Sequence, residues 1–148
     1  VRHVKPHGAL YNMAARDRVL AQAVADAVYE ADPRLLLVGR AGSCLLAAGA
    51  AGGLSVISEA FADRSYQADG SLTPRDQPGA VIRDEQAAAA QVLRMVREGK
   101  VVATDGSEVP IAAETICLHG DGDHAVAFAR RLREALTQAG LEIRSFAL

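Results

Sequence analysis

Histidine and carboxylate side chains gather in one short stretch, TICLHGDGDHA, residues 115 to 125. His119 and Asp121 follow an apolar run that predicts a β-strand. Three interpretations stay open. The two residues are ligands for Zn²⁺ or Mn²⁺, or a general acid and base in which Asp121 fixes the tautomer of His119, or the aspartates cap the helix that follows. We favour chemistry for His119 and Asp121, a helix cap for Asp123 and a solvated position for His124.

A second stretch, VKPHGALYN, has the same order of strand, histidine, glycine and helix. A lysine at a strand end binds anions or carboxylates, and a glycine lets a substrate approach the backbone. Lys5 and His7 are therefore candidate site residues. The structural alternatives are a surface charge for Lys5 and a hydrogen-bonded turn position for His7. Asn12 is expected to cap the following helix, and Tyr11 to pack.

A third polar cluster follows the strand predicted at 54 to 62, in EAFADRSYQADG. Glu59 and Asp63 are candidate catalytic carboxylates. Arg64 either clamps a substrate carboxylate with two parallel hydrogen bonds or forms a salt bridge to Asp63 or Glu59 that holds the loop together. Tyr66 and Arg75 are further candidates for substrate binding, although Arg75 also suits a solvent-exposed loop.

Strands and helices alternate along the chain, which predicts an α/β fold with parallel strands and right-handed crossovers. Ligands of such folds bind at the carboxyl ends of the strands, so we expect all three polar clusters to converge at one end of one parallel array. The predicted elements are strands at 1 to 5, 35 to 39, 54 to 62, 114 to 118 and 141 to 148, helices at 13 to 31, 41 to 51, 85 to 98 and 123 to 138, a hairpin at 101 to 111 around Asp105-Gly106, and a long loop at 63 to 84.

Composition narrows the function further. The chain has 148 residues, 50% of them hydrophobic and 23% charged, with a formal net charge of −2. It can therefore bury a core, and its scattered basic residues argue against a nucleic-acid surface. Cys44 and Cys117 are expected to be free thiols in a reducing compartment. No apolar run reaches the roughly 18 residues that span a membrane, so we expect a cytoplasmic protein that binds no membrane.

Known catalytic motifs are few. GRAGSC, residues 39 to 44, places two glycines before a helix and could hold an anion, but it lacks the P-loop lysine. No GxSxG elbow, HExxH motif or dinucleotide fingerprint is present. The chain begins at Val1 without Met, and we expect a single domain over residues 1 to 148 that is a piece of a longer polypeptide.

Three motifs together carry a specific resemblance. VKPHGALYN, SEAFADRSYQADGSLTPR with PGAVI, and TICLHGD, in this order, resemble the LamB/YcsF family, which is regarded as the A subunit of the ATP-dependent 5-oxoprolinase. The resemblance runs over nearly the whole chain, which looks like the C-terminal portion of a family-length protein. The last motif departs from the family pattern, because Gly122 and Asp123 stand where Asn and Pro are usual.

The resemblance implies an irregular (β/α)7 barrel related to polysaccharide deacetylases, here incomplete. It implies opening of the lactam 5-oxo-L-proline to L-glutamate, driven by ATP with Mg²⁺, together with partner subunits B and C; a bound divalent metal and a homo-oligomer stay open. A barrel cut in this way exposes strand edges, and we expect the isolated chain to be inactive.

Lactam opening suggests roles for the candidate residues. Lys5 and Arg64 would bind the substrate carboxylate or an ATP-derived phosphate, and Glu59 or Asp63 would position water. His7 and His119 would move protons or bind a metal, with Asp121 orienting His119. Two alternatives stay open: a metal-dependent amide or sugar deacetylase that needs no ATP, and a non-catalytic scaffold subunit.

Overall fold

The computed structural model describes residues 1–120 and 125–145. These residues form two compact units, Val1–Glu59 and Ala60–Ser145. Parallel strands and helices alternate along the chain, which confirms the predicted α/β class. Whether residues 1 to 148 behave as a single domain stays a prediction. Within the described residues, no helix combines the length and the apolar character that crossing a membrane requires.

The first unit is built on a parallel sheet in the order β1 (His3–Val4), β2 (Leu36–Arg40) and β3 (Val56–Phe61). β1 pairs with β2, and β2 pairs with β3 so that Arg40 lies opposite Glu59. Because the strands are parallel, their carboxyl ends lie at one edge of the sheet. The residue after β1, Lys5, and the residue near the end of β3, Glu59, therefore share that edge.

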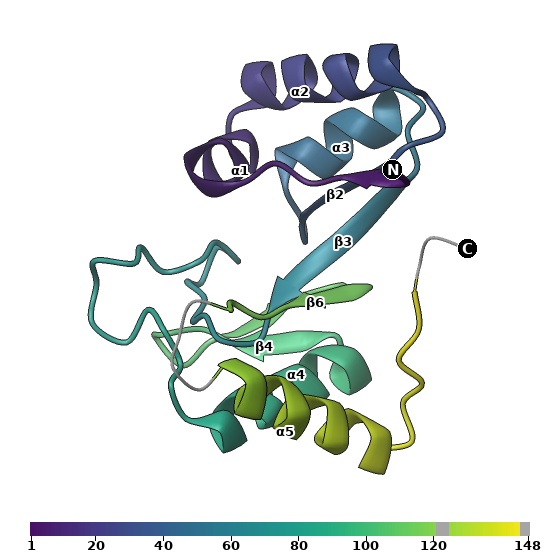
Figure 1. Cartoon of the computed structure of the whole chain (residues 1–148). Helices are drawn as coiled ribbons and strands as arrows, with labels where there is room; N and C mark the ends of the chain where they lie inside the picture. Colours follow the sequence, from purple (N-terminus) through teal and green to yellow (C-terminus); the bar gives the residue numbers. More distant parts are fainter. Residues whose placement is uncertain (121–124, 146–148) are drawn as a thin grey trace. The chain divides into compact units, whose positions relative to one another are not determined.

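Helices α2 (Arg18–Ala31) and α3 (Cys44–Ala51) lie side by side on one face of this sheet (Figure 1). Gly49 permits the close approach of α3, because a Cβ atom there would lie 2.7 Å from Cδ2 of the fully buried Leu37. Small side chains let helix and sheet backbones pack closely. The core of the unit consists of Ala14, Ala21, Ala25, Val28, Leu37, Leu45 and Leu54.

The helix predicted at 13 to 31 is confirmed from Arg18 to Ala31, but the prediction of one unbroken helix from residue 13 is wrong. Two helices, α1 (Gly8–Ala14) and α2, occupy this part of the chain. The Asp17 carboxylate starts α2 by accepting the N–H groups of Val19 and Leu20, because the first N–H groups of a helix need an acceptor outside the helix. The predicted cap role of Asn12 is also wrong, because its side chain donates to the Gly8 carbonyl inside α1.

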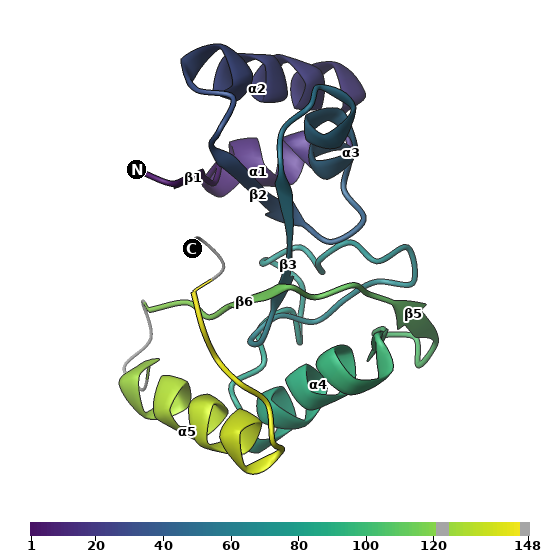
Figure 2. The same cartoon turned by 90° about the vertical axis from the view of Figure 1, so that its right-hand side faces the viewer.

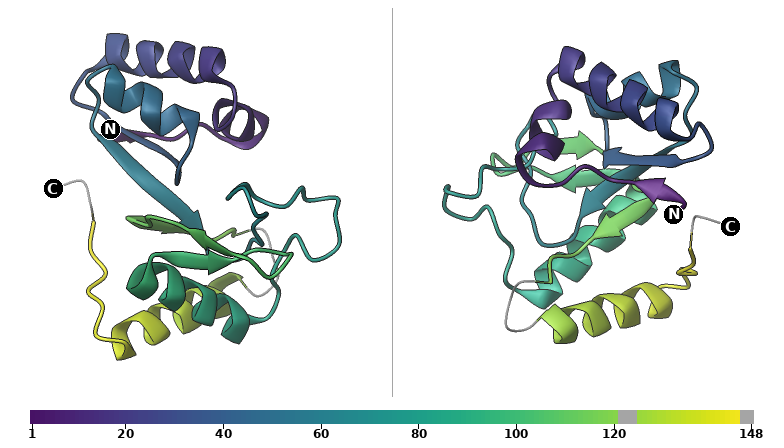
Figure 3. Two further views of the ribbon diagram at one scale, coloured as in Figure 1. Left: turned by 180° about the vertical axis from the view of Figure 1, so that it is seen from behind. Right: turned by 45° about the horizontal axis from the view of Figure 1, so that its top comes forward.

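In the second unit, the backbone after β3 lies beside β6 (Thr115–Cys117), where the Ala62 N–H donates to the Cys117 carbonyl at 2.9 Å. Helices α4 (Glu85–Glu98) and α5 (Ala125–Gln138) lie side by side (Figures 2 and 3). The core that they share consists of Ala62, Ala88, Ala89, Val92, Phe128, Leu132 and Leu136.

Two predictions about the second unit are confirmed and one is wrong. β4 (Lys100–Val102) and β5 (Glu108–Pro110) form an antiparallel hairpin whose turn holds Gly106 at a φ of +87°. The helix predicted at 85 to 98 is α4. The closing strand predicted at 141 to 148 is not formed over residues 141–145, where Leu141 instead packs against the helical core. Apolar alternation favours an extended backbone, but a strand also needs a neighbour in register, which local sequence does not specify.

Candidate active site

Glu59 is a buried carboxylate with two donors. The Lys5 ammonium lies 2.7 Å from its Oε1 atom, and the Tyr11 hydroxyl donates to its Oε2 atom at 2.8 Å. Lys5 Nζ also lies 5.6 Å from the centroid of the Tyr11 ring, in range of a cation–π contact. The three side chains come from β3, from the segment after β1, and from α1. The predicted meeting of Lys5 and Glu59 is thus found within the first unit.

Burial differs sharply within this trio. Glu59 is 4% exposed and Tyr11 5%, whereas the Lys5 side chain is 30% exposed. A buried carboxylate is costly unless it is paired and hydrogen-bonded, and here both of its oxygens are engaged. The arrangement fixes the Lys5 ammonium at the strand end and leaves it within reach of an anion. Sequence reasoning assigned Tyr11 to packing and missed its hydrogen bond to Glu59.

His7 lies close to this trio in sequence and is exposed. It occupies the N-cap position of α1 without a capping hydrogen bond from its side chain. The structural interpretation of His7, a side chain hydrogen-bonded to the turn, is thus not supported by the α1 cap. Its proposed part in proton transfer or metal binding stays a prediction.

Asp63 and His119 form the central contact of the second unit. The Asp63 Oδ2 atom accepts the His119 backbone N–H at 3.2 Å and lies 2.8 Å from Nδ1 of the His119 ring, and Oδ1 lies 2.9 Å from the same nitrogen. The ring also stacks on Phe61, with centroids 5.9 Å apart and planes 23° apart. Position and tilt of the ring are therefore fixed by Asp63 and Phe61, while 27% of the His119 side chain stays exposed.

This geometry defines the chemistry open to His119. A neutral imidazole that donates Nδ1–H to Asp63 presents an unprotonated Nε2, which is the state of a general base. The carboxylate both selects that tautomer and stabilises the imidazolium formed when Nε2 takes a proton. Sequence reasoning gave the orienting role to Asp121, which lies outside the described residues, as do Asp123 and His124.

Residues 1–148 match the LamB/YcsF family. The chain belongs to the LamB/YcsF family. It is 57% identical to the A subunit of 5-oxoprolinase from Shouchella clausii (strain KSM-K16) over 145 residues, which cover 98% of this chain and 57% of that protein. It is likewise 57% identical over 143 residues to the A subunit of 5-oxoprolinase from Geobacillus kaustophilus (strain HTA426), covering 97% of this chain and 56% of that protein.

A solved structure is also similar to this chain. The crystal structure of the lactam utilization protein from Thermus thermophilus has a TM-score of 0.90 to this chain at 49% sequence identity, covering 99% of this chain and 58% of that one. This LamB/YcsF chain therefore spans somewhat less than three-fifths of the length of the relatives that it matches.

The loop at residues 63 to 84 of this LamB/YcsF chain is braced by Arg64. The buried guanidinium donates to the carbonyls of Ala80 and Thr73. Burial lowers the pKa of Arg64 below its usual value, and the nearby Arg75 lowers it further, whereas Asp63 opposes the shift. Holding the loop was one of the two predicted roles of Arg64, but the partners are backbone carbonyls rather than the predicted carboxylates. Its role as a substrate clamp stays a prediction.

Two more predicted substrate contacts lie in this loop. Tyr66 is 0% exposed, and its hydroxyl accepts the Phe61 N–H at 2.8 Å. In this structure Tyr66 therefore holds the end of β3, and its role in substrate binding stays a prediction. Arg75 is exposed, and its role in substrate binding stays a prediction.

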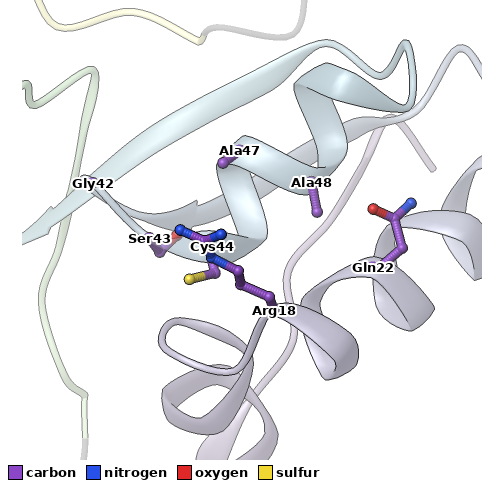
Figure 4. Close-up of a pocket in the computed structure, with 7 residues that line it drawn as sticks. All are labelled: Arg18, Gln22, Gly42, Ser43, Cys44, Ala47 and Ala48. Atoms are coloured by element: carbon purple, nitrogen blue, oxygen red, sulfur yellow. The ribbon is translucent and has the colours of Figure 1, made fainter.

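The GRAGSC stretch lies at a hollow beside the start of α3 (Figure 4). Its polar groups already serve the fold, because the Ser43 hydroxyl accepts the Leu46 N–H at 3.3 Å and the Cys44 N–H donates to the Ala15 carbonyl at 2.9 Å. We assign no ligand to this hollow. It is lined by Arg18, Gln22, Gly42, Ser43, Cys44, Ala47 and Ala48.

Proposed function

We propose that this chain is part of the A subunit of an ATP-dependent 5-oxoprolinase, which opens 5-oxo-L-proline to L-glutamate together with subunits B and C. Membership of the LamB/YcsF family and 57% identity to proteins named as the A subunit of 5-oxoprolinase support this reading. The chain spans less than three-fifths of those relatives, so activity, substrate and partners all belong to the proposal. An irregular (β/α)7 barrel completed by further strands is part of it as well.

The observation that carries the proposal is the Asp63–His119 pair. Lactam hydrolysis needs a base that takes a proton from the attacking water and an acid that returns a proton to the leaving ring nitrogen. Nε2 of His119 can do both in turn, because Asp63 at 2.8 Å from Nδ1 stabilises the intervening imidazolium. The water oxygen bonds to the lactam carbonyl carbon, the carbon–nitrogen bond breaks, and glutamate leaves with a carboxylate and an amine.

Lys5 is proposed to bind an anionic group, either the carboxylate of 5-oxoproline or a phosphate derived from ATP. Its partly exposed ammonium is fixed by the buried Glu59, which reduces the side-chain entropy lost on binding. Glu59 and Tyr11 are then positioning residues for Lys5 in the first unit. That Lys5 and His119 serve one substrate molecule is the central geometric assumption of this proposal.

In this proposal, ATP and its Mg²⁺ are requirements of the complete complex with subunits B and C. No group of three or more His, Cys, Asp or Glu side chains that could hold a metal ion occurs among residues 1–120 and 125–145. The Glu59 and Asp63 carboxylates are already engaged by Lys5, Tyr11 and His119. We therefore derive no step through a divalent ion, and metal binding by His7 and His119 stays a prediction.

The test is turnover of 5-oxoproline by the complete complex with subunits B and C. His119→Ala should lower the rate of glutamate formation by at least about 100-fold, as expected for loss of a general acid–base group, and leave the circular dichroism spectrum unchanged. His3→Ala, at an exposed histidine of β1, is the matched control and should retain turnover. Normal turnover in His119→Ala would remove His119 from the mechanism. Full activity of subunits B and C without this chain would favour a scaffold instead.

A further inference from the structure

Gln91 ties helix α4 to the backbone that carries the candidate base pair. Its Nε2 atom lies 3.0 Å from the carbonyl oxygen of Arg64 and 3.3 Å from those of Phe61 and Ala62. All three partners are acceptors, so the NH₂ end of the amide must face them. One half-buried side chain thus holds the backbone on both sides of Asp63.

The same short segment supplies both contacts that fix the His119 ring. Phe61 stacks on the ring and Asp63 accepts from its Nδ1 atom. This segment spans the end of β3, where the Ala62 N–H still donates to the Cys117 carbonyl beside β6. The Gln91 amide adds a second restraint from α4, because it binds three carbonyl groups of the same segment.

We propose that Gln91 is a positioning residue for His119, which acts by holding Phe61 and Asp63 in the geometry that selects the Nδ1-protonated tautomer. Its catalytic consequence rests on the proposed function, but its effect on the tautomer does not. Gln91 touches backbone carbonyls and neither the ring nor a substrate. A displacement of about 1 Å in a catalytic group is enough to cost up to about 100-fold in rate.

Gln91→Met tests this proposal, because methionine keeps the length of the side chain and removes its donor. In protein labelled with ¹⁵N at histidine, the ring shifts of His119 should report mainly Nδ1–H in the wild type and a mixture of tautomers in the variant. An ionised glutamate in Gln91→Glu presents only acceptors to the three carbonyls. This variant should change the ¹⁵N ring shifts of His119 in the same direction. Gln86→Met, at an exposed glutamine of α4, should leave the ring shifts unchanged.

A thermal unfolding curve for each variant separates positioning from stability. If Gln91→Met and Gln91→Glu lower the melting temperature but leave the His119 ring shifts at wild-type values, Gln91 is a structural brace only and the proposal is wrong. In the complete complex, Gln91→Met should lower kcat between about 10- and 100-fold with little change in KM. Turnover independent of His119 would remove His119 from the proposed mechanism, while the ring shifts would still decide the role of Gln91.

Discussion

The Asp63 carboxylate contacts His119 at two points: it accepts the backbone N–H at 3.2 Å and lies 2.8 Å from Nδ1 of the ring. The first contact fixes the backbone of His119, the second residue after β6, and the second contact fixes the rotation of its ring. Together they restrict His119 more than a ring contact alone would. The relationship predicts a specific outcome when Asp63 loses its charge but keeps an oxygen for the backbone N–H.

Asp63→Asn should change the tautomer of His119. Asparagine keeps one oxygen for the backbone N–H, but its NH₂ group then faces Nδ1 and forces that nitrogen to accept, which moves the ring proton to Nε2. We expect turnover of the complete complex to fall by about 10²- to 10⁴-fold, and ¹⁵N shifts to show Nε2–H. Asp76→Asn, at an exposed position of the same loop, is the control. An unchanged tautomer in Asp63→Asn would contradict this assignment.

Glu59 and Lys5 should be energetically coupled. Glu59→Gln removes the charge that holds the ammonium at 2.7 Å but leaves an oxygen for the Tyr11 hydroxyl. We expect each single variant, Glu59→Gln and Lys5→Met, to lower the free energy of unfolding by about 1–3 kcal/mol. The double variant should lose less than the sum, with a coupling of at least about 0.5 kcal/mol. Urea unfolding measures all three, and strictly additive losses would show that the pair contributes nothing.

Arg64 should control the rigidity of the loop at 63 to 84. Lysine cannot reproduce a planar group that donates to two separate carbonyls, those of Ala80 and Thr73. Arg64→Lys should therefore increase the rate at which trypsin cleaves after the exposed Arg75. Mass spectrometry of the fragments measures this rate. Arg83 is exposed in the same loop. Arg83→Lys keeps the contacts of Arg64 and should be cleaved after Arg75 at the wild-type rate. Equal rates of cleavage after Arg75 in Arg64→Lys and Arg83→Lys would contradict the proposed role of Arg64 in holding the loop.

Sequence patterns predicted the parts of this structure that depend on local signals. α4 begins at Glu85, where the Asp84 carboxylate caps two N–H groups, and the hairpin turns at Asp105-Gly106 as predicted. The meeting of Lys5 with Glu59 followed from parallel strands alone. In each case a cap, a turn or a strand direction is encoded within a few residues.

The missed features are contacts between residues far apart in sequence. Tyr11 reaches Glu59 across 48 positions, and Asp63 reaches His119 across 56. Proximity in sequence favours Asp121 for orienting His119, but Asp121 lies outside the described residues and that role stays a prediction. Which carboxylate reaches a ring is decided by the pairing of strands and by side-chain direction, and one sequence records neither. A useful signal was present, because Asp63 and His119 each follow a predicted strand of one parallel array.

Asp32, at the end of α2, should make a contribution to the stability of the folded state that depends on pH. Hydrogen bonds from the Arg34 side chain and backbone lower the pKa of the Asp32 carboxyl from 3.8 to about 2. A lowered pKa in the folded state means that the stabilising contribution is present above about 3.8 and disappears as the pH falls toward 2. An NMR titration of the carboxyl carbon should show this low pKa, and Arg34→Met should return it toward 3.8. A carboxyl that titrates alike in both proteins would contradict the role of Arg34.

Gly49 should be intolerant of a single added methyl group. A Cβ atom at this position would lie 2.7 Å from Cδ2 of Leu37 and 3.0 Å from Cγ1 of Val56, both on the sheet beneath α3. Alanine favours a helix over glycine by about 1 kcal/mol, so any loss of stability must come from the clash. We expect Gly49→Ala to lower the free energy of unfolding by about 1–3 kcal/mol.

The compensating variant separates this clash from other causes. Leu37→Val shortens the side chain whose Cδ2 atom occupies the space of the new methyl group. Leu37→Val alone should destabilise the protein by leaving a cavity, but the pair Gly49→Ala and Leu37→Val should be more stable than the sum of the single losses predicts. Urea unfolding of the four proteins gives the coupling energy directly. Additive losses would mean that α3 shifts away from the sheet as a whole, and that Gly49 is not what sets its distance from β2.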